Sequence, residues 1–193
     1  MNRRAAAAFL TLGCALCTST AAGAQQVRIE TSSQGEFVEV TAFADMQVDP
    51  GTAWSVISDY DHLADFIPDM RSSRVVRRDG DRLLVDQAGN FGFLFFQQAV
   101  AVRLEVVESP QQRHIVARAV SGNLKQMEGR YTLEVLASGE VRLSYAGRLE
   151  PEFALPPVVG KAVMRRVMAR QFSALVKEIV RRDAAAGPAS PPR

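Results

Sequence analysis

Apolar residues alternate with polar ones near the start of the chain, where an apolar residue stands at every second position from Val38 to Val48. This period of two predicts a strand with one buried face. After the sequence DPG at 49–51, the apolar spacing changes to three and four residues as far as Ile67. That spacing predicts two short helices. Pro68 ends the second one, because proline cannot continue a helix.

Between residues 73 and 150 the alternation returns in short runs that are separated by turn residues. Asp79-Gly80 is a strong hairpin signal, since glycine accepts positive φ angles. Turns at such regular spacing predict a meandering antiparallel sheet. The six strands expected here cover residues 73–78, 82–87, 93–107, 114–120, 124–136 and 141–149.

The last periodic segment is a long amphipathic helix, and no glycine or proline interrupts it over residues 161–182. Pro156-Pro157 suits its start. Its apolar stripe consists of Met164, Met168, Phe172, Leu175 and Ile179. Because this stripe must be buried, the expected fold is α+β: a curved antiparallel seven-stranded sheet holding the C-terminal helix, with two short helices after the first strand.

The first 24 residues have the features of a secretory signal peptide. Arg3 and Arg4 precede a short apolar run, and a small-residue stretch ends at Ala24. The run is shorter than the roughly 20 residues that a membrane-spanning helix needs. We therefore expect cleavage near Ala24 and a periplasmic or secreted protein. The expected organisation is residues 1–24 signal peptide, 25–35 N-terminal linker, 36–182 folded domain and 183–193 disordered tail.

Removal of the leader also changes the composition. Cys14 and Cys17 both lie within it, so we expect the mature chain to contain no thiol, no disulfide and no cysteine metal site. Two of the 23 basic residues are Arg3 and Arg4, which leaves 21 against 21 acidic residues. A neutral chain gives no argument for binding nucleic acid. No cofactor is expected.

Several segments resemble one known family. They are TAWSVISDYDHLADFIPDM, FQQAVAVRLEVVESP, SGNLKQMEGRYTLE and LSYAGRLEPEFALPP, followed by the terminal helix. Together they resemble the polyketide cyclase/dehydrase and coenzyme Q-binding START-like family, which belongs to the SRPBCC or helix-grip superfamily. The resemblance covers residues 36–182 and implies a helix-grip fold with a cavity between sheet and terminal helix. Its members include lipid and quinone carriers and aromatic cyclases, so the resemblance does not choose a function.

A cavity of this kind would bind a hydrophobic or amphipathic small molecule, such as a lipid, a quinone or a polyketide-like compound. Aromatic and methionine side chains would form its adaptable wall, although the same residues could be plain core. A few polar side chains would orient the ligand. The expected pocket residues are Trp54, Phe66, Ile67, Phe96, Gln98, Arg118, Met127, Tyr131, Tyr145, Met164, Met168 and Phe172.

An enzyme of the cyclase or dehydratase type is the main alternative, with His62, Tyr145 or Arg118 as acid or base. No nucleophile and no convergent set of titrating groups accompanies them, so no catalytic residue is assigned. A metal site is not expected, because it needs three or four converging ligands and the only other histidine is remote. Asp59 and Asp61 are interpreted as caps of the short helices.

The last helix also has a basic face. Its charged residues are Lys161, Arg165, Arg166, Arg170, Lys177, Arg181 and Arg182, against the single acid Glu178. The plain interpretation is a solvated surface. A third functional alternative is a module that contacts a membrane surface or another protein through this face, transiently and by charge.

Overall fold

The computed structural model describes residues 27–34, 37–93, 96–152 and 160–187. The strands are β1 (Arg28–Gln34), β2 (Phe37–Met46), β3 (Met70–Asp79), β4 (Arg82–Phe93), β5 (Phe96–Ser109), β6 (His114–Gly122), β7 (Leu124–Val135) and β8 (Val141–Pro151). The helices are α1 (Pro50–Ile57), the 3-10 helix η1 (Tyr60–His62), α2 (Leu63–Phe66) and α3 (Gly160–Ala186). The α+β class and the element order predicted from β2 onward are confirmed.

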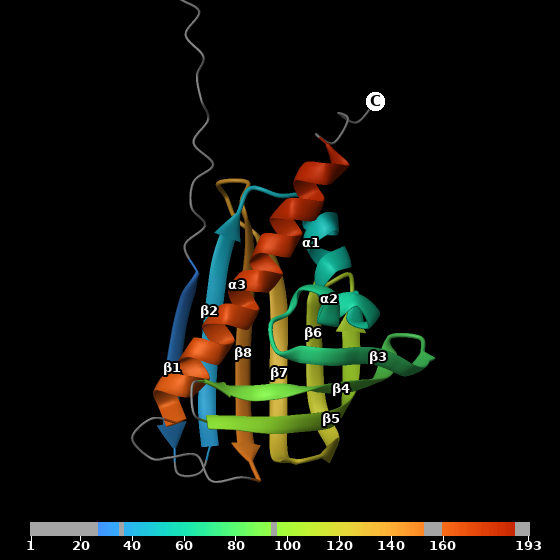
Figure 1. Ribbon diagram of the computed structural model, residues 1–193. Helices are drawn as coiled ribbons and strands as arrows, with labels where there is room; N and C mark the ends of the chain where they lie inside the picture. Colours follow the sequence, from blue (N-terminus) through green and yellow to red (C-terminus); the bar gives the residue numbers. More distant parts are fainter. Residues whose placement is uncertain (1–26, 35–36, 94–95, 153–159, 188–193) are drawn as a thin grey trace, which may run out of the picture.

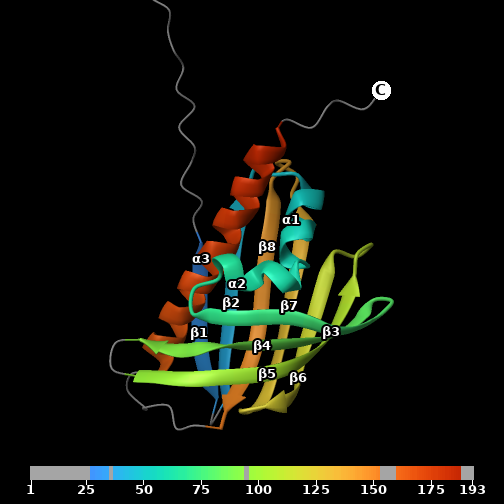
Figure 2. The same cartoon turned by 45° about the vertical axis from the view of Figure 1, so that its right-hand side comes forward.

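All the described strands belong to one antiparallel sheet of eight, in the order β1-β2-β8-β7-β6-β5-β4-β3. Figures 1 and 2 show that the sheet is strongly curved, because β3, β4 and β5 run across the direction of β2 and β8. In both views α3 crosses over β1 and β2. Its apolar face is thereby turned into the concave side. Helix α2 lies against β3, whereas α1 contacts α3 and β7.

The alternation in β2 has the predicted physical cause. Val38, Val40, Ala42 and Ala44 are each at most 5% exposed, while the residues between them are partly or fully exposed. A strand with one buried face needs this period, since successive side chains point to opposite faces. The hairpin between β3 and β4 is also confirmed, with Gly80 at φ 58°.

One extra strand lies at the edge of the sheet. The expectation of a linker over residues 25–35 is wrong for residues 28–34, which form β1 and pair with β2. The sheet therefore has eight strands, not seven. In the segment RIETSSQ only Ile29 is aliphatic, so the strand depends on its backbone pairing and not on an apolar alternation that could reveal it.

The turn after β2 shows which aspartates act as caps. Asp49 Oδ2 accepts a hydrogen bond from the Thr52 backbone N–H at 2.7 Å and so caps α1. The interpretation of Asp59 and Asp61 as caps is wrong. Asp61 Oδ1 accepts from the Val75 N–H at 2.8 Å and ties η1 to β3. Asp59 makes no cap hydrogen bond and instead forms ion pairs.

The terminal helix is longer than predicted. Its apolar stripe is buried as expected, with Met164, Phe172 and Ile179 at most 2% exposed. It continues through Ala186, so the predicted disordered tail begins too early at residue 183. Asp183 contributes to the fold, because its Oδ1 accepts a hydrogen bond from the Asp49 backbone N–H at 2.8 Å. Residues 188–193 lie outside the described part.

Candidate functional site

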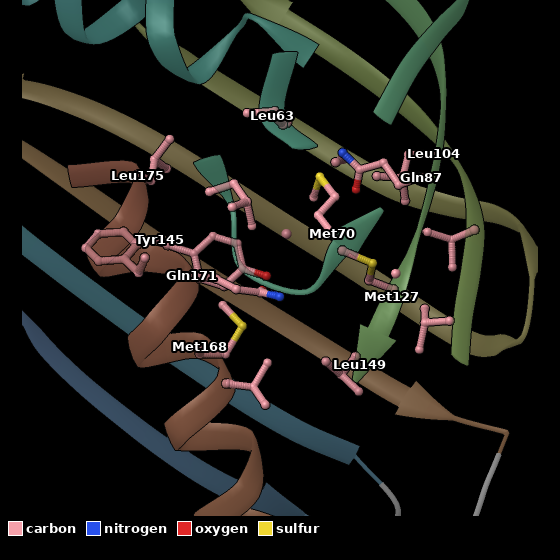
Figure 3. Close-up of a pocket in the computed structure, with 18 of the residues that line it drawn as sticks. Leu63, Met70, Gln87, Leu104, Met127, Tyr145, Leu149, Met168, Gln171 and Leu175 are labelled. Carbon is pink, nitrogen blue, oxygen red and sulfur yellow. The ribbon is translucent and has the colours of Figure 1, made fainter. Parts of the chain in front are cut away.

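A cavity of about 270 Å3 lies between the concave face of the sheet and α3. Figure 3 shows side chains from several elements around it, among them Leu104 of β5, Met127 of β7, Leu149 of β8 and Met168 of α3. Leu63 of α2 stands on another side. The wall is mainly apolar, and the volume is close to the lower end of the roughly 300–1,000 Å3 typical of small-molecule sites.

Two glycines shape the wall beside Tyr145. The register of β7 and β8 pairs Gly129 with Gly147 and Tyr131 with Tyr145. A Cβ atom at Gly129 would lie 2.9 Å from the Tyr145 hydroxyl oxygen, and one at Gly147 would overlap it. The Tyr145 ring therefore lies along the sheet, in space that side chains would otherwise fill. The Tyr131 ring packs beside it, with the ring centroids 4.8 Å apart.

Both tyrosines keep their protons at neutral pH. Burial raises the pKa of Tyr145 to about 12, and burial together with Tyr145 also raises the pKa of Tyr131. Within the part of the chain that is described, neither hydroxyl has a hydrogen-bond partner. Each hydroxyl is thus able to donate a hydrogen bond to a molecule in the cavity. Neither is suited to act as a base near pH 7.

The remaining polar side chains at the wall are amides and one carboxylate. Gln87 of β4 and Gln171 of α3 both appear in Figure 3, and Asn90 follows Gln87 along β4. Gln87 Nε2 donates to Ser73 Oγ at 3.2 Å, which leaves its carbonyl oxygen available. The carboxylate belongs to Asp69. The cavity therefore offers a small number of orienting groups within an apolar wall.

Asp69 joins the segment before β3 to the terminal helix. Its carboxylate forms an ion pair with Arg170 of α3. Its backbone has φ 65°, a left-handed conformation that aspartate tolerates better than most residues. Its carbonyl oxygen accepts from the Asn90 N–H at 2.8 Å. Because Asp69 lines the cavity, this ion pair stands at the cavity wall between two elements.

A third tyrosine, Tyr60, lies at another part of the cavity wall. Tyr60 lines the cavity and is 6% exposed, and its buried hydroxyl has no hydrogen-bond partner. Glu108 is 7% exposed, and its Oε1 also lacks a partner, whereas its Oε2 accepts from Arg78 at 3.2 Å. Burial and the nearby Glu108 carboxylate raise the pKa of Tyr60. This wall of the cavity is therefore backed by an acidic group.

The predicted pocket residues divide into two groups. Those at the cavity wall are Ile67, Met127, Tyr131, Tyr145, Met164, Met168 and Phe172. Those that do not line it are Trp54, Phe66, Gln98 and Arg118. The side chain of Phe96 lies outside those that the structure describes.

The four predicted residues that do not line the cavity make other contacts. Trp54 packs against the hydrophobic core. The Arg182 guanidinium lies over the Phe66 ring, with Cζ of Arg182 5.8 Å from the ring centroid. Gln98 Nε2 donates to the neighbouring Ala99 carbonyl at 3.3 Å. Arg118 follows Ala117, which lines the cavity, so strand alternation turns Arg118 outward, where it pairs with Glu128 at 3.2 Å.

His62 lies in a charged cluster on the outer surface and not in the cavity. Its side chain is 63% exposed, and its Nδ1 is 2.6 Å from Asp59 Oδ1. Arg182 connects the cluster to α3, with its Nη1 2.7 Å from Asp59 Oδ2 and its Nε 2.7 Å from Glu178 Oε1. The hydrogen bond to Asp59 raises the pKa of His62. Of the three weak catalytic candidates, only Tyr145 faces the cavity.

Sequence reasoning missed Tyr60, the glycine pair and the ion pair of Asp69 with Arg170. Gly129 and Gly147 are 18 positions apart in the printed sequence, and only the strand register shows that they face each other. The alternating pattern of β8 does place Gly147 on the same face as Tyr145. This alternation is the one feature of the sequence that indicates the proximity of Gly147 to Tyr145.

Metal ligands do not gather anywhere among the described residues, where no group of three or more His, Cys, Asp or Glu side chains could hold an ion. The described helices also include none that is long and apolar enough to cross a membrane. The predicted signal peptide, with Cys14 and Cys17, lies outside the described part of the chain.

Comparison with solved structures shows the fold again. The Zhui aromatase/cyclase from Streptomyces sp. R1128 superimposes with a TM-score of 0.66 at 17% identity, over 78% of this chain and 98% of that one. A STAR-related lipid transfer protein from Xanthomonas axonopodis gives 0.62 at 11% identity, over 80% and 93%. A START superfamily protein from Mycobacterium smegmatis gives 0.57 at 16% identity, over 77% and 98%.

Sequence comparison identifies the family. No curated protein matches this sequence. The profile of the family described as polyketide cyclase/dehydrase and lipid transport matches residues 46–176, which run from the end of β2 into α3. This range includes all the described residues that line the cavity. The chain therefore belongs to the polyketide cyclase/dehydrase and lipid transport family.

Proposed function

We propose that this protein binds a hydrophobic or amphipathic small molecule in the cavity between the sheet and α3, and carries it without changing it. The cavity itself is the observation that supports this most strongly: about 270 Å3 of space with a mainly apolar wall and few polar groups. Apolar contact contributes about 25 cal/mol per Å2 removed from water, so a ligand that buries about 200 Å2 would gain about 5 kcal/mol.

The composition of the wall supports a ligand that is flexible or variable in shape. Met70, Met127, Met164 and Met168 all line the cavity. Methionine is unbranched and polarisable, so it adapts to irregular surfaces at little cost. Family membership supports binding of this kind, since lipid transport is part of the family's description.

Entry and release require part of the wall to move. The ion pair of Asp69 with Arg170 joins the segment before β3 to α3, and both Asp69 and Met70 line the cavity. Opening of this contact would separate two elements of the wall. Part of our proposal is that the segment from α1 to β3 is the lid.

The site of action belongs to the same proposal. Arg3, Arg4 and the apolar run before Ala24 support export from the cytoplasm. A carrier in the periplasm would move an apolar molecule through water between two membranes or between a membrane and an enzyme. Periplasmic location is tested by fractionation of cells that produce the full chain.

A cyclase-type enzyme is the second candidate. Tyr145 favours it, because its side chain lines the cavity and its hydroxyl has no hydrogen-bond partner in the described part of the chain, so it can donate a hydrogen bond or a proton. The Zhui aromatase/cyclase shares the fold. The two candidates differ in a simple result: a carrier returns its ligand chemically unchanged after incubation, and an enzyme does not.

Binding is tested with N-phenyl-1-naphthylamine, an uncharged probe that fluoresces when it leaves water. The proposal predicts saturable binding to the purified protein. Ala117→Phe places a ring at the cavity wall and should weaken probe binding at least about tenfold, because the added ring occupies the ligand's space. Ala146→Phe adds the same ring at an exposed position of β8 and is the matched control. If both variants bound the probe equally well, the probe would have to bind outside this cavity.

A further inference from the structure

The described wall of the cavity carries very little charge. Among the described wall residues Asp69 is the only charged side chain, and its carboxylate is already paired with Arg170. The other polar groups there are uncharged amides and tyrosine hydroxyls. No lysine or arginine side chain of the described wall reaches the space inside. A ligand with a negative group would therefore meet no cation among the described residues that line the cavity.

The inner wall strengthens this asymmetry. Glu108 lies behind Tyr60 and is 7% exposed, and its only ion-pair partner there is Arg78, whose own side chain is 50% exposed. The uncharged Tyr60 hydroxyl is the group of the cavity wall nearest to this carboxylate, and Arg78 is its one ion-pair partner in the described part of the chain. A buried carboxylate repels a second anion, and solvent screens the repulsion only weakly in the interior.

Uncharged groups have suitable partners in the same wall. The Tyr131 and Tyr145 hydroxyls lack hydrogen-bond partners among the described residues, and the two rings pack beside each other. They can donate to a ligand carbonyl or hydroxyl oxygen, and the Gln171 amide can donate or accept. Burial of a carbonyl or hydroxyl is favourable when it is hydrogen-bonded, whereas burial of a charge also needs a counter-charge.

We propose that the cavity selects uncharged ligands: apolar molecules with a hydroxyl or carbonyl group, and not carboxylates, phosphates or sulfates. This inference rests on the proposed function and narrows it to one chemical class. Free fatty acids and phosphate-bearing lipids are thereby excluded as cargo. Fatty alcohols, ketones and other neutral amphiphiles are included.

The test compares ligands that share one alkyl chain length and differ in their head group, which is neutral in one and anionic in two. Dodecan-1-ol, dodecanoate and dodecyl phosphate are each used at pH 8 to displace N-phenyl-1-naphthylamine from the full-length folded protein. The alcohol should displace the probe at a concentration at least about tenfold lower than either anion. Displacement by an anion at the same or lower concentration would overturn the inference while leaving the proposed function intact. Failure of the probe itself to bind would overturn the proposed function, and this inference with it.

A variant tests the cause of the preference. Gln171→Lys places an ammonium group at the cavity wall, so dodecanoate should gain about tenfold in affinity relative to dodecan-1-ol. Ala184→Lys adds the same charge at an exposed position near the end of α3 and should leave the ratio unchanged. An equal change in both variants would show that net charge, and not the wall, sets the preference.

Discussion

Gly147 lies directly beneath the ring of Tyr145, two residues away on the same face of β8, and a Cβ atom at Gly147 would overlap the tyrosine hydroxyl. Gly129, its partner on β7, leaves the neighbouring space free as well. The position of the Tyr145 ring at the cavity wall therefore depends on the absence of side chains at Gly129 and Gly147. This relationship connects the local sequence of the sheet with the chemistry of the cavity.

Gly147→Ala is expected to displace the Tyr145 ring into the cavity. The added methyl group has no free space, so the variant should lose about 1–3 kcal/mol of unfolding free energy. Probe binding should also weaken, because the displaced ring occupies part of the cavity. Urea denaturation and probe titration measure the two effects. In a Tyr145→Leu background the cost of Gly147→Ala should be smaller, since the overlapping atoms are absent. A cost that is unchanged there would contradict the described packing.

The ion pair of Asp69 with Arg170 is expected to govern ligand release more than stability. Both side chains are partly exposed, at 34% and 40%, so Arg170→Gln should change the unfolding free energy by less than about 1 kcal/mol. Release of N-phenyl-1-naphthylamine, measured by stopped-flow dilution, should become severalfold faster. Asp69→Asn should have the same effect, because asparagine also tolerates the left-handed backbone at this position.

The double variant of these two residues should release the probe no faster than either single variant, since only one contact is lost. Arg165→Gln is the control on the same helix, because Arg165 is exposed and forms no ion pair in the described part of the chain. Unchanged release in Arg170→Gln would contradict the lid at this contact.

Glu178 is expected to make the protein less stable in acid. Hydrogen bonds from Arg181 and Arg182 lower the pKa of Glu178 from its ordinary value of 4.5 to about 2. A carboxyl group whose pKa falls on folding stabilises the fold above its unfolded pKa, and this contribution is lost as the pH falls from about 4.5 towards 2. Allowing for solvent screening, we expect a loss of about 1–2 kcal/mol.

Thermal unfolding between pH 6 and pH 2 measures this loss. Glu178→Gln should flatten the pH dependence in that window. Glu105→Gln is the matched control, because Glu105 forms a more exposed ion pair with Arg82 at 3.3 Å. The same flattening in both variants would show that Glu178 has no special role.

His62 is expected to titrate at higher pH than a free histidine and to have no role in binding. Its hydrogen bond to Asp59 raises its pKa, with Asp65 also raising it and Arg182 opposing the shift. The stabilisation from this group is complete below pH 6.5 and is lost as the pH rises through the raised pKa. NMR titration should show that Asp59→Asn lowers the His62 midpoint. His62→Ala should leave probe binding unchanged, and a clear loss would restore this residue as a site candidate.

The sequence was sufficient to predict a helix or strand where one face of that element is buried along its whole length. The alternation of β2 and the apolar stripe of α3 each recur over many residues, so Val40 and Phe172 could be assigned to the interior with no knowledge of the partner elements. The segment of β1 has no such pattern, because only Ile29 is aliphatic. Backbone pairing with β2 forms that strand, and backbone pairing leaves little trace in the sequence.

The cavity could be predicted only in part, because it depends on how elements face each other. Tyr145 and Met168 could be assigned from alternation and helical spacing. Trp54 and Phe66 were expected at the cavity because they are large and apolar, but the orientation of short helices is set by tertiary packing. The ion pair of Asp69 with Arg170 joins residues 101 positions apart in the printed sequence, so no local pattern indicates it.

Native mass spectrometry of the protein purified from its own cells would show whether the cavity carries an apolar molecule. We expect a stoichiometric adduct that solvent extraction releases as an uncharged apolar compound. The adduct should be absent or strongly reduced in Ala117→Phe but retained in Ala146→Phe. A protein that is isolated empty and takes up no neutral lipid or quinone when these are offered would refute the proposed carrier function. So would an adduct that Ala117→Phe retains in full.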